Sequence, residues 1–136
     1  MVKAWDTDEI IDLYRAGGWW KDEYEPSGIA DLISGSFAFA VAVDPATGSA
    51  VGMGRIISDG VSDGYIQDLV VLPKYRRGGV GSMIVSELLE ACRAGRLVWI
   101  GVVAEQGSEQ IYTRLGFRQM TGIPLLYGNG DSDAHD

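Results

Sequence analysis

The residues best suited to chemistry form a basic, glycine-rich turn, Arg76-Arg77-Gly78-Gly79-Val80-Gly81-Ser82. An apolar run rich in β-branched residues, 66–72, precedes the turn and predicts a strand buried on both faces, which Pro73 ends. After the turn, apolar residues recur at helical spacing through Cys92. A strand that enters a helix through glycines presents unpaired backbone N–H groups and the positive end of the helix dipole. The turn therefore predicts an anion site, and phosphate is the ligand that this geometry favours.

The spacing within the turn narrows the kind of phosphate ligand. No lysine follows Gly81, so the loop does not match the motif that cradles nucleoside triphosphates. Ile84 stands where a dinucleotide-binding loop would need its third glycine. The pattern that remains is Arg76-x-x-Gly79-x-Gly81, although a turn that only lets a strand and a helix pack closely is the plain alternative.

This pattern resembles the pyrophosphate loop of the GNAT superfamily of N-acetyltransferases, [Q/R]-x-x-G-x-[G/A]. A second segment, Ile111-Tyr112-Thr113-Arg114-Leu115-Gly116-Phe117, is similar to the family's Tyr-x-x-Leu-Gly-Phe segment and follows another expected strand. The two motifs cover about the second half of the chain in the family's order. The resemblance implies an α/β GNAT fold, with a mixed central sheet of about six to seven strands, about four flanking helices and a splayed central pair of strands.

The resemblance also implies where acetyl-coenzyme A would bind. The pantetheine arm is expected along Leu69, Val70 and Val71, where a backbone N–H would polarise the thioester carbonyl. The pyrophosphate is expected on the loop residues Arg76, Arg77, Gly78, Gly79, Val80, Gly81 and Ser82. Tyr112 is expected near the sulfur as the general acid, since its ordinary pKa of about 10 allows donation to a thiolate.

The general base is less well defined by the sequence. Strict strand alternation places Tyr65, Gln67 and Leu69 on one face of the central strand and Ile66, Asp68 and Val70 on the other. The carboxylate of Asp68 is expected to face away from the site unless a bulge rotates it. Gln67 is not a base, but it can order a water that carries the proton away. Glu105 and Ser108 stand where the family frequently has asparagine and alanine, so Glu105 is an alternative base or acceptor contact.

The first half of the chain is expected to supply the acceptor wall and part of the sheet. Expected elements are a short strand at 2–5, helices from about 7 and 27, a hairpin of strands 37–43 and 49–57, a strand at 97–103, a helix from 107 or 108, and closing strands that include 125–127. Between the first two helices, Trp19, Trp20 and Tyr24 would suit an aromatic or cationic amine, although aromatic residues mostly serve packing. Gly52 and Gly54 indicate a bulge or a close backbone approach.

The length and composition set broad limits. The chain of 136 residues fits one domain, 1–127, with a tail at 128–136 whose composition is typical of disorder. A net charge of -8 argues against nucleic acid as a partner and favours a cationic acceptor. His135 has no company of metal-ligating residues, so no metal is expected. One cysteine, no signal peptide and no long apolar segment indicate a cytoplasmic protein without a membrane partner, and a homodimer is plausible.

Two classes of function follow. The first is an acetyl-coenzyme A-dependent N-acetyltransferase that acts on a primary amine of a small molecule by direct attack in a ternary complex. The second is a module of the same fold that binds acyl-coenzyme A as a sensor and turns nothing over. Acetylation of a protein or peptide amine is a third reading. It would need a wide groove for the peptide, and a sequence does not show the width of a groove.

Overall fold

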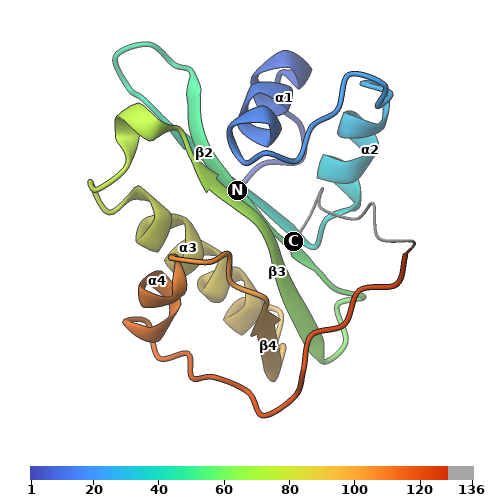
Figure 1. Cartoon of the computed structure of the whole chain (residues 1–136), viewed down its shortest axis with the longest axis vertical. Coiled ribbons are helices and arrows are strands. Elements are labelled where there is room, and N and C mark those ends of the chain that lie inside the picture. The colour runs from blue at the N-terminus through green and yellow to red at the C-terminus, as the bar shows by residue number, and fades with distance from the viewer. Residues whose placement is uncertain (129–136) are drawn as a thin grey trace.

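The computed structural model of the protein describes residues 1–128 and shows one mixed sheet between two layers of helices (Figure 1). Within these residues the sheet has four strands, β1 (Ala38–Val43), β2 (Ala50–Ile57), β3 (Asp63–Val71) and β4 (Trp99–Val102), in spatial order β1-β2-β3-β4. The pairs β1–β2 and β2–β3 are antiparallel, whereas β3 and β4 are parallel. This arrangement confirms the predicted hairpin and the predicted parallel partner of the central strand.

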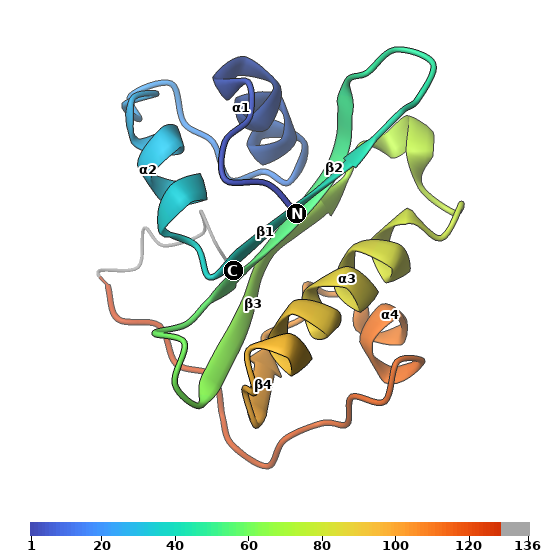
Figure 2. The ribbon, with the colours of Figure 1, turned by 180° about the vertical axis from the view of Figure 1, so that it is seen from behind.

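The helices divide between the two faces of the sheet (Figures 1 and 2). Helices α1 (Thr7–Ala16) and α2 (Gly28–Gly35) cover one face, and α3 (Val80–Ala94) and α4 (Glu109–Thr113) lie on the other. Asp6 begins α1 by accepting a hydrogen bond from the backbone N–H of Glu9. Each layer has its own apolar core, with Leu13 and Phe39 on the α1 side, and Ile66 and Leu88 on the α3 side.

The number of strands differs from the expectation. The sheet has four strands in the described residues rather than six to seven. Residues 2–5 form no strand, although the N–H of Val2 donates to the carbonyl oxygen of Phe39 at 2.8 Å. Residues 118–127 also form no strand, and their apolar side chains stay exposed, Leu125 at 91%. Apolar strand-forming residues therefore did not suffice here, because a strand also needs a neighbour to accept its backbone hydrogen bonds.

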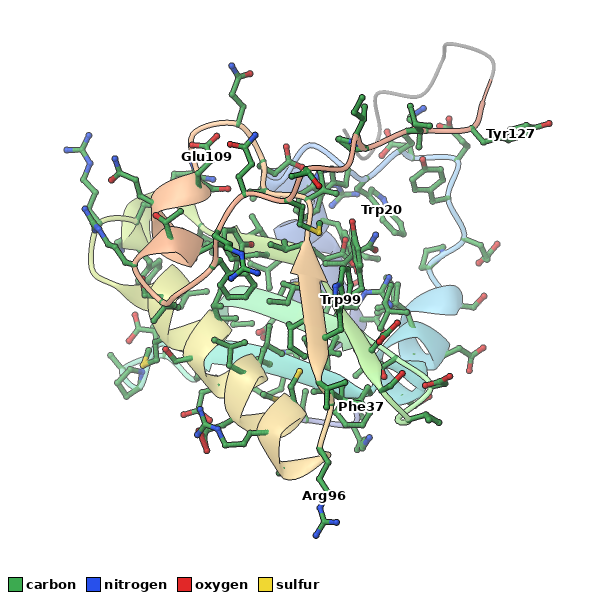
Figure 3. All side chains as sticks on the ribbon, turned by 90° about the horizontal axis from the view of Figure 1, so that it is seen from below. Trp20, Phe37, Arg96, Trp99, Glu109 and Tyr127 are labelled. Carbon is green, nitrogen blue, oxygen red and sulfur yellow. The ribbon has the colours of Figure 1, made fainter. Side chains whose placement is uncertain are left out.

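Other boundaries also differ from those expected. Helix α3 begins at Val80, within the predicted turn 76–82, because Gly79 already takes the capping position. Figure 3 shows the side chain of Tyr127 pointing away from the body of the molecule, in agreement with its full exposure. The predicted disordered tail, apart from residue 128, and the lone His135 lie outside the described residues.

A β-bulge interrupts the alternation of β3 at Asp68. The backbone of Asp68 has a φ of 61°, and the pairing with β2 shifts between Met53 and Arg55. Before the bulge Ile66 packs in the α3-side core, whereas after it Val70 packs in the α1-side core. The predicted alternation, with Ile66, Asp68 and Val70 on one face, is therefore wrong, because one inserted residue exchanges the two faces of the strand. A left-handed conformation costs a residue other than glycine about 1–2 kcal/mol.

The two glycines of β2 have a packing reason. A Cβ on Gly54 would lie 3.0 Å from Ile84 Cγ2 and 3.2 Å from Leu88 Cδ1, both on α3. A Cβ on Gly52 would also lie 3.0 Å from Ile84. The predicted close approach is thus confirmed, and Gly54 also lies at the register shift opposite the bulge.

Two further observations concern the helices. Cys92 is a free thiol buried within α3, as expected of a core residue, and burial raises its pKa. Among residues 1–128, every helix is too short or too polar to cross a lipid bilayer.

Candidate functional site

The main cleft of the molecule opens where β3 and β4 separate. The two strands pair from Asp63 and Trp99 as far as Ile66 and Val102, where β4 ends while β3 continues to Val71. A cleft of about 1000 Å³ lies beyond this point. Its lining includes residues 65–71 of β3, the last residue of β4, Val102, and residues 103 and 105–108 of the segment after it. One wall is therefore a strand whose edge is no longer covered by its neighbour.

One end of the cleft has the properties of an anion site. Gly79, at φ 81°, precedes α3, and no side chain caps the helix. The N–H groups of the first helical turn are therefore available to a ligand, together with the positive end of the dipole. Arg76, Arg77 and Arg114 line the same cleft. This end of the cleft is the loop for which the sequence predicts a phosphate site.

Local contacts hold the loop in position. The Nε of Arg76 donates to the carbonyl oxygen of Val71 at 2.8 Å, which ties the loop to the end of β3. The hydroxyl of Tyr75 donates to Asp44 at 2.7 Å and so joins the loop to the β1–β2 turn. This hydrogen bond lowers the pKa of Asp44. A Cβ on Gly81 would lie 3.1 Å from Ile111 Cδ1, so a glycine here lets α4 approach α3 closely.

Tyr112 lies on α4 and lines the cleft. Its ring is buried and meets Phe117 edge to face, with the ring centroids 5.5 Å apart. Burial, with a smaller contribution from the negative charge of Glu105, raises the pKa of Tyr112 to about 12. The hydroxyl therefore keeps its proton throughout the physiological range and can act there as a proton or hydrogen-bond donor.

Gln67 and Asp68 lie at the middle of the cleft, on the bulged part of β3. The Oδ2 of Asp68 accepts hydrogen bonds from the hydroxyl of Tyr14 and the Nε of Arg55, each at 2.7 Å. Burial and the adjacent Asp68 carboxylate raise the pKa of Tyr14. A more distant contact, 3.5 Å long, joins Arg55 Nη2 to Gln67 Oε1. The carboxylate of Asp68 thus already accepts hydrogen bonds from other side chains of the protein.

The structure divides the predicted acceptor wall. Trp19 is buried against Tyr14 and lines the cleft. Trp20 and Tyr24 contact each other edge to face and line a separate hollow of about 420 Å³ beside α1. Only Trp19 of the three therefore lies at the cleft.

Most of the predicted coenzyme residues come together. Lining residues of the cleft include Leu69, Val70, Val71, Arg76, Arg77, Gly79, Val80, Gly81 and Ser82. Gly78 lies in the same turn without lining the cleft. The sequence analysis assigned no role in the site to Tyr14, which donates a hydrogen bond to Asp68. It also assigned none to Pro124 and Leu125, which line the cleft. The sequence marks Tyr14 only as part of an apolar helix face, and no local signal links it to a residue 54 positions later.

No group of three or more histidine, cysteine, aspartate or glutamate side chains within residues 1–128 is arranged to hold a metal ion.

Comparison with known proteins agrees with this geometry. The sequence profile of the Acetyltransferase (GNAT) family matches residues 5–117, which is most of the chain. The protein therefore belongs to the GNAT acetyltransferase family.

Two curated relatives are similar in sequence. GCN5-related N-acetyltransferase 3, chloroplastic, from Arabidopsis thaliana is 31% identical over 81 residues, which are 60% of this chain and 34% of that protein. The uncharacterized N-acetyltransferase ycf52 of Pyropia yezoensis is 27% identical over 109 residues, 80% of this chain and 63% of that protein. The chain thus spans about one third to two thirds of the length of these relatives.

Solved structures share the fold. A GNAT family acetyltransferase from Streptococcus pneumoniae superimposes with a TM-score of 0.74 at 25% identity, covering 96% of both chains. A Trypanosoma brucei acetyltransferase gives 0.77 at 24% identity, covering 93% of this chain and 95% of that one. A Mycobacterium tuberculosis protein solved in complex with CoA gives 0.69 at 23% identity, covering 89% and 73%. The α/β GNAT fold is therefore established for this chain.

Proposed function

We propose that the protein transfers an acetyl group from acetyl-coenzyme A to a primary amine of a small molecule. The observation that carries this proposal is the cleft between β3 and β4, which leads from Tyr112 to the uncapped start of α3. A long ligand with a phosphate at one end and a thioester at the other matches this order of groups. The Mycobacterium tuberculosis protein of the same fold was solved with CoA, which supports the choice of ligand.

The reaction follows from this placement. The neutral amine attacks the thioester carbonyl carbon, a C–N bond forms, and the carbonyl oxygen becomes an oxyanion. A backbone N–H of residues 69–71 stabilises that oxyanion, as donors fixed in a dry site do most effectively. The C–S bond then breaks, and the hydroxyl of Tyr112 donates a hydrogen bond or a proton to the departing thiolate. The amine loses a proton to water ordered by Gln67 or to the exposed carboxylate of Glu105, both of which line the cleft.

The raised pKa of Tyr112 affects the departure of the thiolate. A phenol with a pKa of about 12 is a weaker acid than the thiol it would form, whose ordinary pKa is about 8.5. Full proton transfer from Tyr112 is therefore uphill, and its larger contribution is a hydrogen bond to the developing negative charge on sulfur. Solvent can complete the protonation after the bond has broken.

We expect that the rate does not decline as the pH is raised to about 10. The neutral tyrosine is the active form, and its pKa is raised to about 12, so raising the pH to 10 leaves it protonated. Deprotonation of the acceptor amine should therefore raise the rate until it reaches a plateau. A pH–rate profile of kcat from pH 6 to 10 measures this, and a decline centred between pH 8 and 9.5 would contradict it.

The second candidate is a binding module without turnover. The observation that favours it is that hydrogen bonds from other side chains already hold the carboxylate of Asp68. This carboxylate already accepts hydrogen bonds from Tyr14 and Arg55, so it is poorly placed to take a proton from an amine. Water commonly replaces a direct base in proton transfer, so we retain the enzyme as the main proposal.

A thiol-release assay with acetyl-coenzyme A distinguishes the two. The acceptors should include arylalkylamines, polyamines, aminoglycosides, amino acids and short peptides, with calorimetric titration of coenzyme A in parallel. Binding with turnover of a small amine supports the enzyme, and turnover of peptides alone would replace the small-molecule acceptor. Binding without any turnover favours the sensor. If coenzyme A fails to bind to the folded protein, both proposals are wrong.

A further inference from the structure

Asp68 combines three unusual properties. It has a backbone φ of 61°, which is uncommon for a residue other than glycine. It is a charged residue with only 7% of its surface exposed. It also lies at the point where β3 changes the face on which its side chains pack. Such a combination persists only where the surrounding structure compensates for it.

The compensation comes from two other elements. Arg55, on β2, places its Nε 2.7 Å from Asp68 Oδ2, and this ion pair is nearly dry, with side-chain exposures of 16% and 2%. Tyr14, on α1, donates its hydroxyl to the same oxygen at 2.7 Å. Both donors come from the α1 side of β3, so they draw the carboxylate toward that side. Charge-assisted hydrogen bonds of this length are among the stronger polar contacts in proteins.

The direction of the carboxylate decides on which face of the sheet each of the following side chains of β3 packs. With Asp68 turned toward α1, Leu69 and Val71 pack with the α3-side core and Val70 packs with the α1-side core. Without the bulge, strict alternation would exchange these three side chains between the faces. The same three residues form the wall of the cleft along which the acyl carrier would lie.

We propose that Asp68 is a positioning residue, held by Arg55 and Tyr14, that fixes the bulge and thereby aims the backbone of residues 69–71 into the cleft. The role in binding the acyl carrier rests on the proposed function, whereas the effect on the face on which each β3 side chain packs does not. Arg55 and Tyr14 act on the bulge through Asp68, and the other side-chain contacts of Arg55, with Ser36 and Gln67, are longer, at 3.5 Å each. If Asp68 were the general base instead, Asp68→Asn would lower kcat strongly and leave coenzyme A affinity unchanged, so the two roles can be separated.

The test uses four variants of the full chain. Asp68→Asn keeps an acceptor oxygen and tolerates a positive φ, whereas Asp68→Ala loses both advantages. Arg55→Met and Tyr14→Phe leave Asp68 in place and remove one donor each. Arg93→Met is the matched control for Arg55→Met, because Arg93 pairs with Glu90 on the exposed surface of α3. Thermal unfolding identifies the variants that remain folded.

Three readouts are needed. The first is coenzyme A affinity by calorimetry, with an expected loss of about tenfold for Arg55→Met, more for Asp68→Ala, and less than about threefold for Asp68→Asn and Arg93→Met. The second is the pattern of methyl NOEs, which should join Val70 to the α1-side core in the wild type and lose that connection in Asp68→Ala. For Asp68→Asn, kcat should stay within about threefold, whereas loss of a base costs about 10²–10⁴.

Clear results would overturn the proposal. Folded Arg55→Met and Asp68→Ala variants that keep the wild-type NOE pattern would show that the bulge needs no carboxylate. A loss of kcat above about a hundredfold in Asp68→Asn, with unchanged coenzyme A affinity, would make Asp68 the base instead. If Asp68→Ala and Arg55→Met do not fold, the more conservative Tyr14→Phe variant decides. Loss of the Val70 connection or of coenzyme A affinity in that variant supports the positioning role, and wild-type values for both contradict it. A wild type that does not bind coenzyme A would refute the proposed function while the NOE pattern still tests the positioning role.

Discussion

Replacement of Gly79 by glutamate should abolish measurable binding of coenzyme A while the protein remains folded. Gly79 has a φ of 81°, which costs a side chain about 1–2 kcal/mol, and a Cβ there would meet no atom within 4 Å. The new carboxylate would stand at the start of α3, where the phosphates are expected. Repulsion of about 3 kcal/mol between this carboxylate and the phosphates would weaken binding by about a hundredfold or more, whereas the backbone strain lowers the stability of the fold. Calorimetric titration of coenzyme A measures the change directly.

Gly48→Glu provides the matched control for this substitution. Gly48, in the turn between β1 and β2, also has a positive φ, 73°, and a Cβ added to it would likewise meet no atom within 4 Å. The backbone strain and the added charge are therefore equal in kind, but the residue does not line the cleft. Gly48→Glu should lower stability about as much and leave affinity within about twofold. Unchanged affinity in folded Gly79→Glu would exclude the loop as the phosphate site.

Tyr112→Phe should reduce kcat by about a hundredfold and leave the affinity for coenzyme A nearly unchanged. The substitution removes only the hydroxyl, so the buried edge-to-face contact with Phe117 is retained. A positioned proton or hydrogen-bond donor contributes about 10²–10⁴ to the rate, and the raised pKa of Tyr112 places the expectation at the lower end. Steady-state kinetics together with calorimetry separate the two effects.

Tyr75→Phe is the corresponding control, since it also removes a tyrosine hydroxyl from the lining of the cleft. That hydroxyl donates to Asp44 and lies in the segment before the phosphate loop. Its loss should therefore affect coenzyme affinity by a few fold and kcat little. Equal kcat in wild type and Tyr112→Phe would remove the tyrosine from the mechanism, and an equal fall in both variants would point to a general effect on the cleft.

Local sequence was enough to predict the elements around the proposed phosphate site. Glycines after a buried strand, followed by apolar residues at helical spacing, allow few conformations, and the structure has β3, the turn and α3 in that order. The spacing of Arg76, Gly79 and Gly81 also led to the family, which the family profile confirms. These signals are short-range, because glycine φ angles, helix caps and strand ends depend on neighbours in the chain.

Tertiary structure decided the middle of the cleft and the edges of the sheet. Alternation along β3 predicted the wrong face for Val70, because the bulge depends on Tyr14 and Arg55, which lie 54 and 13 positions from Asp68. Apolar residues at 125–127 suggested a closing strand, but no strand forms there in the described part of the chain. The sequence by itself thus determined the family, the turn before α3 and the order of these elements. The face of each β3 side chain, the partners of Asp68 and the separation of Trp19 from Trp20 required the fold, because they depend on contacts between distant segments that no local pattern encodes.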